Sequence, residues 1–238
     1  MIKKVFACFL AFLCFSSIFP IFAQSSAVKY QIPEASEGQI NEAVQNIVPL
    51  RFLPGHPLYF LIVVKETFNS FFQPSSAKVA QFQAVLSGKR LKETYQLILE
   101  GDNSNAFNNL EKYQKTNIRV IDKLQKAIGQ NQEVTPLAAE IAESLKSQEV
   151  LFYAILNHDK ELMNNNDYKI RFENGVESFI SVAMTINSIK PGIKDRFKTV
   201  ISWEGTNKEL LKEATGSATP EPRLFEATAS VRPKRIIY

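Results

Sequence analysis

The sequence predicts an all-α protein, an up-down antiparallel bundle of four or five helices, preceded by a signal peptide and followed by a disordered tail. Three observations lead to this fold class. Apolar residues recur every three or four positions through most of the chain, strand-like alternation is rare, and only 9 of the 238 residues are glycine. Prolines, glycines and capping residues fall where this spacing is interrupted, as expected at helix ends.

Residues 1–23 have the layout of a secretory signal peptide. Lys3 and Lys4 precede a long apolar run, and Ala23 supplies the small residue that a signal peptidase needs before Gln24. An uncleaved anchor is the alternative, because the run approaches the about 17–25 residues of a membrane span. We favour cleavage and expect a secreted or extracytoplasmic protein, with tethering to the membrane as the second possibility.

The leader also contains both cysteines, Cys8 and Cys14. After its removal the chain can form no disulfide and no thiolate metal site. The formal net charge falls from +4 to +2 without Lys3 and Lys4, so we expect no nucleic-acid partner.

Residues 24–48 are polar, contain Pro33 and Gly38, and show no sustained period, which predicts a spacer. The bundle domain is expected over 49–165. Its first helix is predicted from Leu58 to Phe72, after a turn in which Pro57 stands at or near the first helical position.

The second helix is predicted from Ser75 or Ser76 to about Leu99, with Gly101 ending it. Small residues at Ala80, Ala84 and Gly88 would let another helix approach closely, which favours a tight hairpin.

The third helix is expected from a cap at Ser104 to Gly129, with polar steps at Gln114 and Asn117. The fourth opens at Thr135-Pro136, follows an apolar seam to Leu162, and ends in the 164–167 cluster. The connections are short, which favours antiparallel neighbours.

Over 166–213 we expect additional helices packed on the bundle. Helical spacing covers 175–189, whereas 197–203 is compatible with a short helix or a strand. From 214 to 238 the composition indicates a disordered tail.

A group of residues around the first helix forms a motif: Pro54, Gly55, Pro57, Leu58, Tyr59, Phe60, Leu61, Lys65, Phe71 and Phe72, with Lys89 and Arg90 on the next helix. This pattern, over about 48–157, resembles the bacterial domain-of-unknown-function 5667 family. The resemblance implies an exported or membrane-anchored helical domain and brings no reaction, substrate or cofactor. The chain departs from the family pattern at Ile62, Gln73 and Gly88.

Candidate chemistry is sparse. His158 is expected on the apolar side of the fourth helix with Glu161 one turn on, a pairing found in carboxylate-bridged metal centres, but a second histidine from another helix is missing. The pairs Glu140 with Glu143 and Glu209 with Glu213 are typical of a solvated helix face. The sequence therefore predicts no catalytic residues, no metal and no cofactor.

Residues 58–64 are all apolar, which is more than one helix face needs. Burial of the first helix on most sides explains this, and an exposed contact with a partner or membrane is the alternative. We expect a non-enzymatic binding, structural or sensory module of the cell envelope with an envelope protein as partner. A small-ligand sensor lined by Gln114, Asn117 and Gln148, a metal sensor, and an enzyme using His158 with bundle carboxylates are the alternatives.

Overall fold

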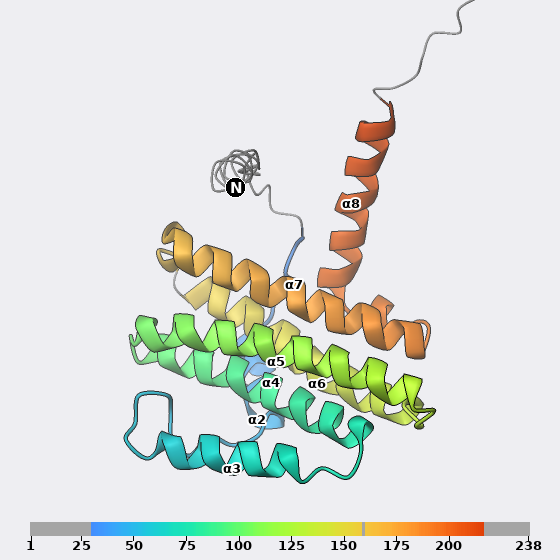
Figure 1. The fold of residues 1–238 in the computed structure, drawn as a ribbon. Helices are drawn as coiled ribbons and strands as arrows, with labels where there is room; N and C mark the ends of the chain where they lie inside the picture. The colour runs from blue at the N-terminus through green and yellow to red at the C-terminus, as the bar shows by residue number, and fades with distance from the viewer. Residues whose placement is uncertain (1–29, 159, 217–238) are drawn as a thin grey trace, which may run out of the picture.

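The computed structural model describes residues 30–158 and 160–216, with side chains up to residue 209. The predicted signal peptide, the cleavage site at Ala23 and Gln24, and nearly all of the predicted tail lie outside these residues. The described chain is all-helical, as predicted (Figure 1). Its seven α-helices are α2 (Glu37–Asn46), α3 (Tyr59–Phe71), α4 (Ser76–Leu99), α5 (Asn103–Gly129), α6 (Thr135–His158), α7 (Asn166–Ile189) and α8 (Lys198–Gly216).

Helices α4 to α7 form the bundle as two stacked antiparallel hairpins. The start of α4 meets the end of α5, where Ser76 Oγ donates to Gln130 Oε1 at 2.9 Å. Between the hairpins the neighbours run parallel, because contacts join their starts. Gln81 of α4 donates to Glu140 of α6, and Arg171 Nη1 of α7 donates to Glu111 Oε2 of α5 at 2.9 Å. The consecutive helices α5 and α6 therefore lie diagonally, unlike the side-by-side neighbours expected from their short connection.

Aromatic packing fills the centre of the bundle. The Phe152 ring of α6 takes edge-on contacts from Tyr113, Phe172 and Phe179, with ring centroids 5.5–5.9 Å apart. Edge-to-face pairs of this kind contribute beyond their buried area. Phe152 thus joins three helices of the core.

Local signals explain most helix ends. The Ser75 side chain accepts from Lys78 N at 3.2 Å at the start of α4, and Gly101, with φ +77°, ends that helix. The cap of α5 is Asp102 rather than the expected Ser104. Because α6 ends at His158, Leu162 lies in a short 3₁₀ turn, Leu162–Asn164, and not in the helix.

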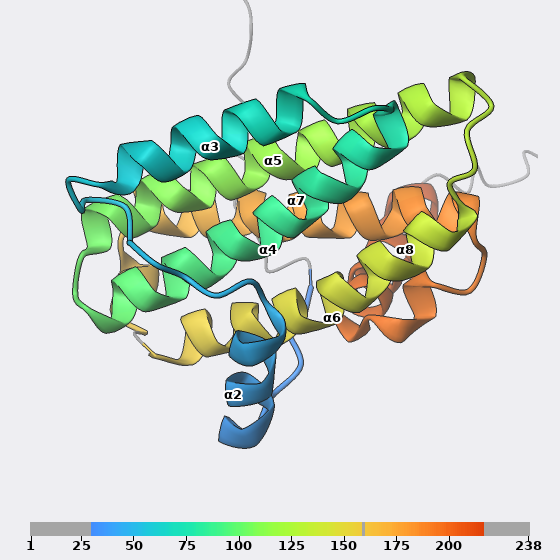
Figure 2. The ribbon, with the colours of Figure 1, turned by 90° about the horizontal axis from the view of Figure 1, so that it is seen from below.

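Two segments differ from their expected roles. The expected spacer contains α2, which begins at a capping box between Ser36 and Gln39 and packs on α6 with Ala43 and Ile47 buried. Helix α7 begins at Asn166, earlier than the spacing over 175–189 predicts, and belongs to the bundle core (Figure 2). Residues 198–203, left open between helix and strand, are helical in α8.

Helix α3 lies on the outside of the bundle, beside α4 and α5 (Figures 1 and 2). It is the most apolar helix of the described chain, yet it is not enclosed by other helices. The candidate interaction surface lies on this helix.

Candidate interaction surface

Helix α3 turns polar side chains toward the bundle. Its two buried residues are Tyr59 and Glu66, seven positions apart and therefore on one face of the helix. They meet a charged segment in the middle of α4 that includes Lys89, Arg90 and Glu93, all of them buried. We call these five residues the α3–α4 charge cluster.

The cluster is closely connected. Glu66 pairs with both Lys89 and Arg90. Arg90 Nη1 donates to Glu93 Oε2 at 2.9 Å, and the Tyr59 hydroxyl donates to the same oxygen at 3.0 Å. Two carboxylates and two cations balance in charge, which is the condition under which ions are tolerated away from water.

The electrostatics follow from burial and proximity. Burial raises the pKa of Tyr59, and the nearby Glu93 raises it further, so the hydroxyl stays protonated and remains a donor. Burial opposes the charge of Arg90, but Glu93, Tyr59 and Glu66 outweigh it and leave the pKa of Arg90 raised. Arg90 is therefore a fixed cation that holds α3 against α4.

The opposite face of α3 is apolar and open to solvent. The exposed fractions are 81% for Phe71, 72% for Phe72, 59% for Phe60 and 58% for Phe68, and Leu61 and Val64 are also exposed. At 100° per residue these six side chains fall within one sector of the helix, opposite Tyr59 and Glu66. We call this sector the α3 apolar face.

A basic groove runs beside this face. Lys112, Lys115 and Arg119, on one side of α5, line a groove of ≈ 490 Å³ whose opposite wall includes Val63 and Phe71 of α3. Lys115 pairs with Glu111 at 2.5 Å, whereas Lys112 and Arg119 make no ion pair within the described part of the chain. Lys112 Nζ lies 5.8 Å from the centroid of the Tyr59 ring.

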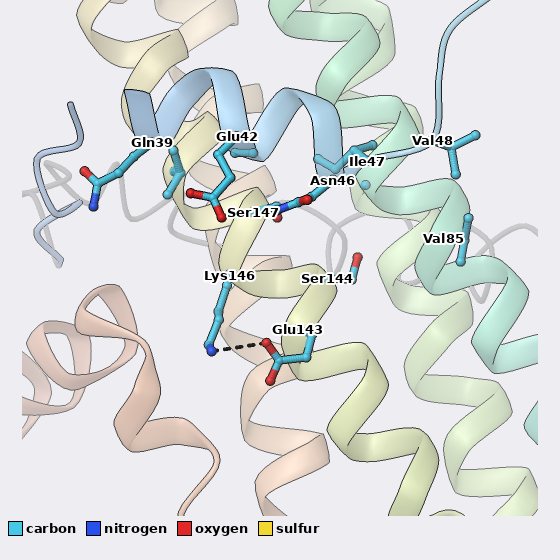
Figure 3. Close-up of a pocket in the computed structure, with 13 residues that line it drawn as sticks. Gln39, Glu42, Asn46, Ile47, Val48, Val85, Glu143, Ser144, Lys146 and Ser147 are labelled. Atoms are coloured by element: carbon cyan, nitrogen blue, oxygen red, sulfur yellow. Dashed lines mark ion pairs between the residues drawn. The ribbon is translucent and has the colours of Figure 1, made fainter. Parts of the chain in front are cut away.

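A second groove, of ≈ 540 Å³, lies between α2, α4 and α6 (Figure 3). Glu42 and Asn46 of α2 lie over Ser147 of α6 in that view. Glu143 at its rim pairs with Lys146 at 3.1 Å and with Arg196, which lowers the pKa of Glu143 through hydrogen bonds from both cations. A carboxylate held in this way is a poor general base, and the groove is open to solvent with a mixed polar and apolar lining.

The residues considered for catalysis or metal binding do not converge. His158 ends α6 as an exposed residue, which corrects its expected place on the apolar side, and Glu161 is exposed in the following turn. Within residues 30–158 and 160–216 there is no group of three His, Cys, Asp or Glu able to hold a metal ion. His56 stacks on Phe52 and accepts from Leu58 N at 3.1 Å, a structural role in the turn before α3.

The seam amides are used in packing. Gln148 accepts from the Tyr113 hydroxyl at 2.8 Å and donates to Ser144 Oγ at 3.1 Å. Asn117 joins α5 to α7 through Ser178. Both are fully buried, whereas Gln114 is half-buried. Such pairs define which helices meet and in which register.

The structure divides the motif residues between the two faces of α3. Tyr59, Lys89 and Arg90 belong to the charge cluster, while Leu58, Phe60, Leu61, Lys65, Phe71 and Phe72 are exposed. Pro54 is buried and Gly55 has φ +101°, a conformation suited to glycine, in the turn. Sequence reasoning missed Glu66 and Glu93. The sequence shows only that each of the two helices carries charged residues in its interior, and that these charges meet is seen in the structure.

No protein-family model, curated protein or solved structure matches this chain. The resemblance to the domain-of-unknown-function 5667 family therefore stays a prediction. Among the helices of the described residues, none is both long enough and apolar enough to span a bilayer.

Proposed function

We propose that this chain is a non-enzymatic binding module of the bacterial cell envelope, which docks through the α3 apolar face. One observation carries the proposal: α3 places its polar residues Tyr59 and Glu66 inside and its phenylalanines outside. Burying the phenylalanines and exposing the charges would be the ordinary arrangement for a helix on a bundle. The inverted arrangement leaves apolar surface without a partner in the monomer.

The size of the patch supports a binding role. The four phenylalanines expose on the order of 500 Å² together, since one such side chain carries about 150–250 Å². Contiguous apolar patches of about 300–600 Å² are the largest on typical monomers and are often functional. The charge cluster would hold α3 in place while its outer face is occupied.

Cysteine protection in intact cell envelopes tests the proposal. The only natural cysteines are Cys8 and Cys14, so single-cysteine variants can be built in a C8A/C14A background. Phe68→Cys reports on the α3 apolar face. Ile170→Cys, at an exposed apolar residue of α7 on the far side of the bundle, is the matched control.

We expect a membrane-impermeant maleimide to label Ile170→Cys equally in envelopes and in the purified protein. It should label Phe68→Cys fully only in the purified protein. Equal labelling of Phe68→Cys in both preparations would show that the α3 apolar face is unoccupied and would contradict the proposed function.

A further inference from the structure

We infer that the occupant of the α3 apolar face is the surface of a bilayer that contains anionic phospholipids. The inference rests on the proposed function and names the partner of the same surface. It is carried by the combination of two features on one side of the molecule: exposed phenylalanines on α3 and an adjacent row of cations on α5.

The apolar part has the form of an interfacial helix. Helix α3 has 13 residues, too few to cross a membrane. The helix ends at Phe71, and the exposed aromatic surface continues onto Phe72, the next residue. A helix that lies in the plane of the interface buries one apolar face at the boundary between headgroups and acyl chains, with Phe and Leu on that face. The α3 apolar face has this composition.

The charged part complements anionic headgroups. Lys112, Lys115 and Arg119 are exposed and line the groove beside Phe71, and Lys65 is exposed on α3 itself. Basic side chains near an anionic leaflet each favour binding by about a fivefold change in affinity. A purely apolar protein partner would leave these charges without a role.

A second copy of the chain fits less well. Specific, stable protein interfaces bury about 800 Å² on each partner, more than the phenylalanines of this face expose. A symmetric contact through α3 would also bring the two basic grooves toward each other, where like charges repel. A bilayer needs no shape complementarity and supplies the opposite charge.

Docking of the protein on a membrane through α3 is consistent with the predicted cleavage after Ala23. Gln31 N, near the beginning of the described chain, donates to Ser202 Oγ of α8 at 2.8 Å, on the side of the bundle opposite α3 (Figure 1). The seven residues from Gln24 to Tyr30 can span at most about 25 Å. A retained leader would hold the α7–α8 side toward the membrane, whereas a released chain is free to dock through α3.

Vesicle co-sedimentation tests the inference, with protein purified from the extracytoplasmic fraction. The vesicles are phosphatidylcholine alone or phosphatidylcholine with phosphatidylglycerol at 7:3.

The apolar variant is Phe68→Ser/Phe71→Ser, with Ile170→Ser/Ile201→Ser as its control. The charge variant is Lys112→Glu/Arg119→Glu, with Lys190→Glu/Lys208→Glu as its control. These two lysines are exposed, at the end of α7 and in α8, and both helices lie on the side of the bundle away from α3 (Figure 1). Circular dichroism verifies that each variant keeps its helix content.

We expect binding to the anionic vesicles at low salt, weakened by added NaCl because salt screens exposed charges. The apolar variant should lose at least tenfold in affinity and the charge variant about 30-fold, while both controls keep the affinity of the unmodified protein. Equal binding to neutral and anionic vesicles, or equal binding by the variants and their controls, would overturn the inference.

Two further results separate this inference from the proposed function. If Phe68→Cys is protected in envelopes but the purified protein binds neither vesicle, the module has a partner that is not the bilayer, and only this inference fails. If sedimentation equilibrium shows a dimer that Phe68→Ser/Phe71→Ser abolishes, and vesicles do not bind, the occupant is a second copy. If Phe68→Cys is not protected in envelopes and the purified protein does not bind vesicles, both proposals are rejected.

Discussion

Replacement of Glu66 by glutamine should release α3 from the bundle without unfolding the rest of the protein. Glu66 is the only charged residue of α3 in the α3–α4 charge cluster, and it pairs with both Lys89 and Arg90 of α4. The substitution keeps the size of the side chain and removes its charge. The cluster then carries two cations against the single carboxylate of Glu93.

The magnitude follows from the burial of the pair. The Glu66, Lys89 and Arg90 side chains are only 10–11% exposed. Removing one partner of a buried ion pair costs about 3–5 kcal/mol, because it leaves an uncompensated charge. At about 1.4 kcal/mol for each factor of ten, the equilibrium for opening α3 should rise by at least about 100-fold.

Native-state hydrogen exchange measures this opening helix by helix. In Glu66→Gln the amides of α3 should lose about two orders of magnitude of protection, while those of α4 to α7 keep theirs. Glu111→Gln is the control, since Glu111 also pairs with two cations, Lys115 and Arg171, but is 42% exposed and should change little. Unchanged protection of α3, or an equal loss through α4 to α7, would refute the reasoning.

Three further predictions concern the bundle. Phe152→Ala should lower the free energy of unfolding by about 3–5 kcal/mol in denaturant titration, because three rings pack on this side chain, and a loss below about 1 kcal/mol would contradict that packing. Gly175→Ala, in the middle of α7 with no neighbour closer than 3.6 Å to the added methyl group, should stabilise by up to about 1 kcal/mol. Gly101→Ala, at φ +77°, should destabilise by about 1 kcal/mol, so a shift of the melting temperature in the same direction for both glycines would be inconsistent with this account. Burial raises the pKa of Glu149 above its ordinary value of 4.5, so its contribution to stability is present at low pH and is lost as pH rises through the raised pKa. Thermal unfolding of Glu149→Gln should therefore show a variant more stable than the unmodified protein at pH 7, with a difference that shrinks toward pH 4; a constant difference would argue against it.

Local chemistry explains why much of the fold could be predicted from the sequence. Ser75, Gly101 and Thr135 act through a few neighbouring residues, and the structure has helix boundaries at or next to them. Helix α2 was missed although Ser36 and Gln39 form a capping box, a signal present in the sequence. The diagonal placement of α5 and α6 depends on packing between distant residues, which periodicity cannot show.

The candidate surface was harder to predict for a physical reason. The run from Leu58 to Val64 shows that α3 is apolar, and apolar helices are usually buried. Whether α3 is buried depends on Glu66 meeting Lys89 and Arg90, a contact between two helices that neither reveals alone. The sequence identified Lys89 and Arg90 through a family-like motif, but their role as the inner support of an exposed helix required the structure.

Depth-dependent quenching tests the central claim most directly, namely that the α3 apolar face lies at the hydrocarbon boundary of an anionic bilayer. A bimane fluorophore is attached to Phe68→Cys or, as the control, to Ile170→Cys, and the vesicles carry a spin label at carbon 5 of the acyl chain. The account predicts strong quenching at position 68 and none above background at position 170. Equal quenching at the two positions, or none at position 68 with the protein bound, would contradict it.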